Sequence, residues 1–318
     1  MDFLLLQICG SMIVSVGVVY VGNSIKKGIY THLKLQKDAC TPIEIDKLPK
    51  IERYETVSSA YSIIVSKQGI LGHLSDFDKL LSSIDHVDKT TFLNHIPHLK
   101  VYIDHTRKRP KGDYKIDENM IVVNPEDERA TVYYNLLKAS ISRKVESTYA
   151  QGFTRYIKDD DGQIRSKIGY GLTIPYLDMI YERYFSPIIT EEGDLDTCSS
   201  ILSIFEELIG YKTMERLFFS SALDELVDIL SPHITRKQTI KLIRNIDHLY
   251  EAINTKNVVV AALAQSTFRE TAEILAKLML GMGKSKEEID ALLNLKFRTS
   301  TYSYSLRPKD KTAIKKLL

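Results

Sequence analysis

The sequence predicts a mainly helical α+β fold with a small sheet, preceded by a membrane-spanning helix. Apolar residues recur at helical spacing over most of the chain after residue 54. Two short segments, 99–104 and 120–124, instead have the alternating or β-branched composition of strands. A third observation is an uncharged apolar stretch at the N-terminus, from Phe3 to Val21. Together these features indicate an anchored helical body with few strands.

The composition is that of a globular chain with a substantial core. Charged residues make up 26% and hydrophobic residues 44% of the 318 residues. The formal net charge of +2 is too balanced to favour nucleic-acid binding, and no nucleic-acid-binding motif is present. Cys9, Cys40 and Cys198 are widely spaced and form no CxxC pair. We therefore expect neither a disulfide framework nor a cysteine metal site.

The stretch from Phe3 to Val21 has the properties of a membrane anchor. As a helix it would be about 28 Å long, close to the roughly 30 Å hydrocarbon core of a bilayer. Only Asp2 precedes it, whereas Lys26 and Lys27 follow it. This charge bias predicts a single-pass anchor over residues 1–24 with the bulk of the chain in the cytoplasm. A cleaved signal peptide, which needs a positive n-region and a shorter apolar core, and a buried core helix are the alternatives.

The rest of the chain divides into a linker and a globular body. Residues 25–50 read as a juxtamembrane linker, in which Pro42 and Pro49 disfavour a continuous helix. The body begins at residue 51. Its first part, residues 51–98, is a helical lead-in with two or three helices.

Two strands and a series of helices follow the lead-in. Leu99–Asp104 alternates as a strand does, Thr106–Gly112 is a basic loop, and Met120–Asn124 is β-branched. Ser285 and Glu288 form a capping box that opens one of the later helices. The basic tail after Arg307 is either a solvated end or a segment that lies on an anionic membrane surface. Helices are expected at 128–146, 176–185, 200–209, 214–230, 236–253, 255–279 and near 286–293.

The order of elements between Asn119 and Tyr184 resembles that of a peptidase family. The strand Met120–Asn124, an acidic turn, the helical run Thr131–Ser140 and the later Gly169-Tyr-Gly-Leu-Thr-Ile-Pro segment follow one another. This order is similar to that of HExxH zinc metallopeptidases with a later N-E-G motif, the gluzincin pattern, in a form typical of uncharacterised bacterial metallopeptidase-like proteins. The resemblance implies a zincin-like core over residues 99–230 and a helical C-terminal part over 231–318.

In that family the first helix supplies two His ligands and a Glu general base, and a second helix supplies a carboxylate ligand. Here HExxH falls on Tyr134, Asn135 and Lys138, and N-E-G falls on Thr173–Pro175 with Ile174 at the ligand position. Tyrosine is a poor zinc ligand at neutral pH, lysine carries its own charge, and isoleucine cannot bind metal. Asparagine cannot accept a proton from water. The resemblance therefore implies no catalytic residue, no metal and no cofactor; an ordinary amphipathic core helix without peptidase ancestry is the alternative.

Further residues belong to this vestigial cleft. Asp178 falls where the family has a second carboxylate after N-E-G, and it either lines a polar cleft with Tyr134 and Asn135 or is a surface residue. Lys138 either replaces the metal charge and holds a peptide carboxylate, or points to solvent. Outside this cleft, Glu206 and Glu207, in a Glu-x-x-Gly type segment, are expected to pack or cap helices.

The leading interpretation is a membrane-anchored, catalytically inactive metallopeptidase-like protein, a pseudopeptidase, that binds a peptide or protein partner. The expected binding edge is the strand formed by Met120, Ile121, Val122 and Val123, because extended peptides pair with the backbone of an exposed strand. Two alternatives stay open. One is an active hydrolase with an unrecognised site, and the other is a helical structural adaptor at the membrane.

Overall fold

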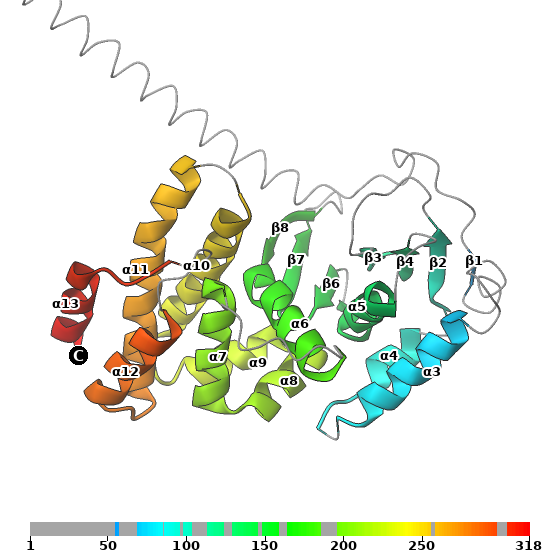
Figure 1. The fold of residues 1–318 in the computed structure, drawn as a ribbon, viewed down its shortest axis with the longest axis horizontal. Coiled ribbons are helices and arrows are strands. Elements are labelled where there is room, and N and C mark those ends of the chain that lie inside the picture. Colours follow the sequence, from blue (N-terminus) through cyan, green and yellow to red (C-terminus); the bar gives the residue numbers. More distant parts are fainter. Residues whose placement is uncertain are drawn as a thin grey trace, which may run out of the picture.

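The computed structural model describes residues 55–56, 69–84, 86–95, 98–103, 113–123, 129–145, 148–158, 164–185, 196–255, 258–297 and 304–318. The anchor predicted at Phe3–Val21, the linker 25–50 and the basic loop Thr106–Gly112 lie outside these residues. Within the described helices, none combines the length and the apolar composition needed to cross a bilayer. The described chain is mainly helical with two small sheets, which confirms the predicted mainly helical α+β class (Figure 1).

The first sheet contains the two predicted strands and two that were not predicted. Its order is β1-β2-β4-β3. The predicted strands β2 and β4 are parallel, while β1 and β3 run antiparallel to their neighbours. The strands span Glu55–Thr56 (β1), Lys100–Ile103 (β2), Asp113–Lys115 (β3) and Met120–Val123 (β4).

The prediction that Met120–Val123 offers a free strand edge is wrong. β4 lies inside the sheet, where β2 pairs with one side of its backbone and β3 with the other. The side chains of Met120, Ile121 and Val122 are also buried. The alternation and β-branching of a segment indicate a strand but not its neighbours, so a central strand and an edge strand look alike in the sequence. In the described sheet the outer strand on this side is β3.

The helix that carries the HExxH-like positions, α5, is surrounded by other elements. It spans Arg129–Ser140 and packs against β3 and β4, against α6, and against α3 (Gly69–Ser82) and α4 (Thr90–His95). Every side chain from Thr131 to Ser140 is buried except that of Lys138. An amphipathic surface helix would expose a whole face. α5 is therefore a central helix of the fold.

α5 ends six residues earlier than the predicted 128–146 helix. The side chains of Ser140 and Ser142 donate hydrogen bonds to the carbonyls of Leu137 and Lys138 (2.7 and 2.6 Å), which satisfies acceptors in the last turn. The chain after Ile141 then enters a second sheet that was not predicted. This antiparallel sheet has the order β5-β6-β7-β8. Its strands span Ser142–Val145, Thr148–Gln151, Thr154–Lys158 and Ile164–Ile168.

The remaining helices form the half of the molecule that Figure 1 shows beside this sheet. The predicted single helix 214–230 is two helices, because Ser221 has a left-handed backbone (φ 49°) that no helix continues through. The predicted helices 236–253, 255–279 and 286–293 are confirmed, as is the Ser285–Glu288 capping box. The spans are Tyr170–Tyr184 (α6), Thr197–Ile209 (α7), Tyr211–Phe219 (α8), Leu223–Leu230 (α9), Arg236–Asn254 (α10), Val258–Gly281 (α11), Lys286–Lys296 (α12) and Pro308–Leu317 (α13).

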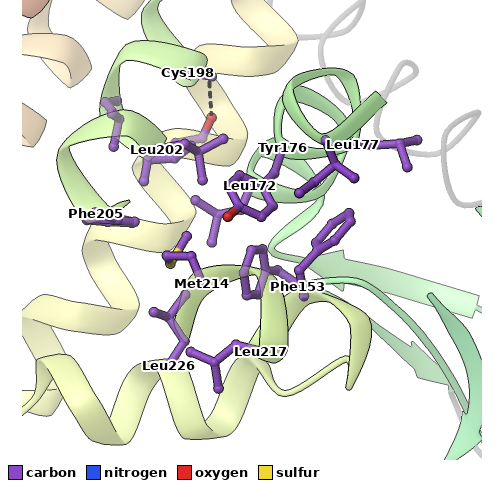
Figure 2. Packing of buried hydrophobic residues seen from close by; sticks show 14 of the residues in the cluster. Phe153, Leu172, Tyr176, Leu177, Cys198, Leu202, Phe205, Met214, Leu217 and Leu226 are labelled. Carbon is purple, nitrogen blue, oxygen red and sulfur yellow. Dashed lines mark hydrogen bonds between the residues drawn. The ribbon is translucent and has the colours of Figure 1, made fainter. Parts of the chain in front are cut away.

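A single hydrophobic core runs through both halves (Figure 2). At its centre the Tyr176 ring of α6 packs edge-on to Phe218 of α8, with 5.0 Å between ring centroids. Phe153, at the turn between β6 and β7, lies 5.5 Å from the same Phe218 ring. Such pairs add to the free energy gained by burying the rings themselves. The second sheet is thus fixed to the helical half through α8.

The start of α6 is held by a carboxylate from a distant helix. Gly169, the N-cap residue, has a left-handed backbone (φ 83°) and no side chain to cap the helix. Asp247 of α10 fills that role, since its two oxygens accept from the amides of Gly169 (2.8 Å) and Gly171 (2.7 Å). Asp247 is buried. A carboxylate at a helix N-terminus satisfies free N–H groups and interacts favourably with the helix dipole.

Replacing Gly171 by alanine is expected to force α6 and α10 apart. An added Cβ would lie 2.7 Å from both the Cα of Asp247 and the carbonyl oxygen of Ile246, and both are backbone atoms. We expect a loss of about 3 kcal/mol or more in the free energy of unfolding, measured by urea denaturation followed by circular dichroism. Gly283→Ala is the control: nothing lies within 4 Å of its Cβ position, so only backbone strain at φ 87° remains, about 1–2 kcal/mol. Equal losses for the two variants would contradict the close approach of α6 and α10.

Asp247 is also expected to make stability depend on pH. Burial raises its pKa from the ordinary 3.8 to about 7, although the two amide hydrogen bonds act in the opposite direction. Between these pH values the folded chain holds a proton that the unfolded chain has released. The stability contributed by Asp247 is therefore full below about pH 4 and is lost as the pH rises through about 7.

The measurement is the free energy of unfolding of the wild type and of Asp247→Asn from pH 4 to pH 8. The advantage of the wild type over the variant is expected to shrink as the pH rises. Glu207→Gln, at an exposed position of α7, is the control for the effect that removing one carboxylate has on the pH dependence of stability. An advantage that grows with pH would show that the amide hydrogen bonds outweigh burial.

Candidate functional site

Two helix faces that the resemblance links are next to each other in the fold. Tyr134 and Lys138 lie one turn apart on α5, and Ile174 and Asp178 lie one turn apart on α6. Residues four apart share a face of a helix. Because α5 packs against α6, side chains from these two pairs can meet.

The meeting point is a cluster of polar and aromatic side chains, which we call the Tyr134 cluster. The hydroxyl of Tyr134 donates a hydrogen bond to the carboxylate of Asp178. The Tyr134 ring packs edge-on to the ring of Tyr181, at a centroid distance of 5.7 Å. The Lys138 Nζ lies over the Tyr134 ring, 5.0 Å from its centroid, within the range of a cation–π contact. Tyr250 of α10 adds a further phenol, close enough to Tyr134 and Asp178 to interact with them electrostatically.

The electrostatics of the cluster keep the hydroxyls of Tyr134 and Tyr250 protonated. Burial raises the pKa of Tyr134, and the negative charge and hydrogen bond of Asp178 raise it further. Burial also raises the pKa of Tyr250, again with a contribution from Asp178. A neutral phenol is a hydrogen-bond donor and not an anionic metal ligand. The cluster therefore offers one ammonium, one carboxylate and neutral hydroxyls.

Two of the predicted site residues do not join these contacts. Asn135 is fully buried, and its amide donates to the carbonyl of Thr131 on its own helix (2.9 Å), while its Oδ1 has no hydrogen-bond partner. It therefore does not line a cleft, because one residue along a helix rotates a side chain by roughly 100°. Ile174 is half-buried on the same face of α6 as Asp178, and it adds only apolar surface.

The donors needed for a metal centre are not gathered here. Among the described residues, no group of three or more His, Cys, Asp or Glu side chains is placed to hold an ion. In the Tyr134 cluster Asp178 is the single carboxylate, and the other members are Lys138 and the three phenols of Tyr134, Tyr181 and Tyr250. Such a set can bind a charged or hydrogen-bonding group of a ligand, with the ammonium favouring an anion.

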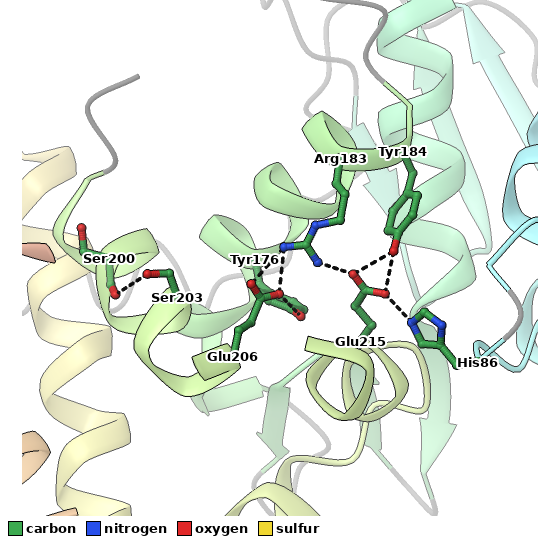
Figure 3. A network of polar contacts seen from close by, with 8 residues as sticks. All are labelled: His86, Tyr176, Arg183, Tyr184, Ser200, Ser203, Glu206 and Glu215. Carbon is green, nitrogen blue, oxygen red and sulfur yellow. Dashed lines mark hydrogen bonds and ion pairs between the residues drawn. The ribbon is translucent and has the colours of Figure 1, made fainter. Parts of the chain in front are cut away.

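A second polar network, which we call the Glu215 network, joins α6 to α7 and α8 (Figure 3). The carboxylate of Glu215, on α8, is fully buried. It accepts hydrogen bonds from His86 Nε2 (2.5 Å), from the Tyr184 hydroxyl (3.0 and 3.1 Å) and from Arg183 Nη1. A buried carboxylate is stable only when it is paired in this way.

Arg183 extends the network to α7. Its Nη2 donates to both oxygens of Glu206 (3.0 and 2.9 Å), and Glu206 also accepts from the Tyr176 hydroxyl (2.8 Å). Glu206 thus has the helix-packing role expected from the sequence, whereas Glu207 is exposed. Since each of these acids is bonded to several donors, the network joins α6, α7, α8 and the segment after α3 and presents no open catalytic group.

Comparison with known proteins adds no relative to this description. No protein-family model matches the chain, and neither the curated proteins nor the solved structures contain a match.

Sequence patterns identified part of the site. The spacing of Tyr134, Lys138 and Asp178 was visible, because four-residue spacing defines a helix face. Tyr181 and Tyr250 were missed: Tyr181 lies one turn after Asp178 and fits the same face, whereas Tyr250 is contributed by a helix far along the chain. The Glu215 network was also missed, since its members are up to 129 residues apart and are joined only by tertiary packing.

Removal of the Tyr134 hydroxyl is expected to destabilise the fold only when Asp178 is present. We predict a coupling free energy of about 1–2 kcal/mol between Tyr134→Phe and Asp178→Ala. Either substitution alone already removes the hydrogen bond to the charged group, so the second substitution has no such bond left to remove. The four proteins of the double-mutant cycle are compared by urea denaturation. Tyr184→Phe combined with Asp178→Ala is the control, since Tyr184 bonds Glu215 instead. Additive losses for Tyr134 and Asp178 would mean that the two side chains do not interact.

Proposed function

We propose that this protein is a membrane-anchored, catalytically inactive metallopeptidase-like protein that binds an extended peptide or protein segment. The anchor is the uncharged stretch Phe3–Val21. The zincin-like region covers residues 99–230. The Tyr134 cluster stands where the metal centre of an active relative would be, with Lys138 supplying positive charge in place of the metal.

One contact carries the proposal. The resemblance assigns Tyr134 to the first ligand of the metal helix and Asp178 to the second carboxylate of the partner helix, two positions 44 residues apart in the sequence. Their hydrogen bond supports this assignment, because it brings the two positions into contact. The order β4 and then α5 also agrees with a strand that precedes the metal helix, and α6 follows after the four strands of the second sheet.

The ligand is proposed to lie between the outer strand and the cluster. β3 (Asp113–Lys115) is the outer strand of the described sheet and packs against α5. Its outer backbone groups suit the addition of an extended segment, for which the specificity comes from side-chain pockets. Lys138, the half-buried residue between Thr131 and Ser140, is the residue proposed to bind a carboxylate of that segment.

Restoring the lost ligands tests the assignment directly. We expect the triple variant Tyr134→His, Lys138→His, Ile174→Glu to bind about one Zn²⁺ per chain, since two imidazoles one turn apart and a facing carboxylate form a zinc site. The wild type is expected to retain none. The full chain is loaded with Zn²⁺ in detergent, freed of unbound metal, and measured by elemental analysis.

The variant Tyr134→His alone, with one ligand restored, is the matched control and should remain empty. A folded triple variant without zinc would show that the positions do not converge, and the resemblance would fail. Tightly bound zinc in the wild type would instead favour an active hydrolase with other ligands.

Peptide binding is tested with a displayed library of random peptides that have free C-termini, selected on the full chain. Lys138→Ala is expected to lower the affinity for the selected peptides by about tenfold, which is the effect of losing one charge-assisted hydrogen bond. Lys237→Ala, at an exposed position of α10, is the control and should leave binding unchanged. Binding that is indifferent to Lys138 would favour an adaptor that uses another surface.

A further inference from the structure

Two arginines of the second sheet project from one face beside each other. Arg143 of β5 pairs in register with Ala150 of β6, which in turn pairs with Arg155 of β7. Residues in register across neighbouring strands have their side chains on the same face. Between the two arginines lies only the buried Ala150, whose side chain is a methyl group. Their guanidinium groups therefore extend toward the same region.

Both guanidinium groups reach a single carbonyl in the turn between α8 and α9. Nη2 of Arg143 donates to the carbonyl oxygen of Ser221 at 3.1 Å, and Nη2 of Arg155 donates to the same oxygen. Ser221 has a left-handed backbone (φ 49°) and is held there by its hydroxyl, which donates to the Ile141 carbonyl at 2.6 Å. One carbonyl oxygen thus accepts hydrogen bonds from two guanidinium groups.

The site has more positive charge and more donors than its neighbours satisfy. The ion pair that the described residues make with these guanidinium groups is between Arg155 and Asp224, at 3.7 Å, and the Asp224 side chain is 78% exposed. Nε of Arg143 and Nη1 of Arg155 are buried N–H groups without any hydrogen-bond acceptor. Burial lowers the pKa of both arginines, and the charge of Arg143 lowers that of Arg155 further. Each guanidinium nevertheless stays charged.

A helix N-terminus adjoins the two arginines. α9 begins at Leu223, two residues after Ser221, and its N-cap Ala222 has no side-chain hydrogen bond to the first turn. Asp224, in that first turn, is the residue that approaches Arg155. The free amides of the first turn and the helix dipole favour negative charge at this place.

We propose that Arg143, Arg155 and the start of α9 form a binding site for a phosphate-class oxyanion. A phosphate group carries between one and two negative charges at neutral pH and has several acceptor oxygens, so it matches two guanidinium forks. A single carboxylate does not, because Asp224 already supplies one and leaves two buried N–H groups unpaired. The exposed Asp224 carboxylate is the group that the entering anion displaces from Arg155.

The test is calorimetric titration of the full chain with inorganic phosphate, at an ionic strength held constant with chloride. We expect saturable binding that Arg143→Gln and Arg155→Gln each weaken by about tenfold or more, since each removes a charge-assisted interaction. Arg244→Gln, at an exposed position of α10, is the matched control and should bind as the wild type does. Circular dichroism verifies that each variant is folded.

Asp224→Asn keeps the proposal testable if the arginine variants fail to fold, because it changes an exposed side chain. It is expected to tighten phosphate binding by about threefold, as removal of one partly screened surface charge would. A parallel titration with glycerol 3-phosphate distinguishes the two sources of the phosphate group. Tighter binding of glycerol 3-phosphate indicates a lipid headgroup, and equal binding indicates free phosphate.

Absence of saturable binding in the chloride-matched buffer would overturn the proposal. So would equal affinity in the folded wild type, Arg143→Gln, Arg155→Gln and Asp224→Asn, because the anion would then bind elsewhere.

Discussion

The buried carboxylate of Asp247 at the start of α6 is the constraint on which the rest of the structure depends. It holds the amides of Gly169 and Gly171 and so joins α10 to the helix that carries Asp178, Arg183 and Tyr184. The approach is so close that only glycine fits at position 171. α6 in turn contacts α5, α7, α10 and the second sheet. A shift of α6 would therefore disturb both polar networks at once.

The two networks on α6 have different physical characters. Around Glu215 every buried acid is paired with several donors, which is how a folded chain stabilises charge inside a core. The Tyr134 cluster instead combines an ammonium, a carboxylate and neutral phenols around α5, where Lys138 is the one half-buried side chain between Thr131 and Ser140. The Glu215 network therefore contributes to stability, and recognition is proposed for the Tyr134 cluster.

The second sheet has a comparable division. On one face of the sheet, the Thr154 hydroxyl donates a hydrogen bond to the Thr173 hydroxyl of α6 (2.9 Å). On the other face, the side chains of Arg143 and Arg155 donate hydrogen bonds to the carbonyl of Ser221. Thr154 and Arg155 are successive residues of β7, so their side chains point to opposite faces of the sheet. A single short sheet thus supports the α6 helix on one face and collects positive charge on the other.

The sequence by itself determined the helices α7, α10, α11 and α12, the strands β2 and β4 and the four-residue spacing of Tyr134–Lys138 and Ile174–Asp178, because periodicity and capping are local properties. It did not reveal that β4 is a central strand, that α5 ends at Ser140, or that four further strands follow. Those features depend on which backbone groups pair across the fold. Only the tertiary structure brought Tyr134 to Asp178, Arg143 and Arg155 to Ser221, and Asp247 to Gly169. Each of these contacts joins residues that no local pattern connects, and burial decides their energies.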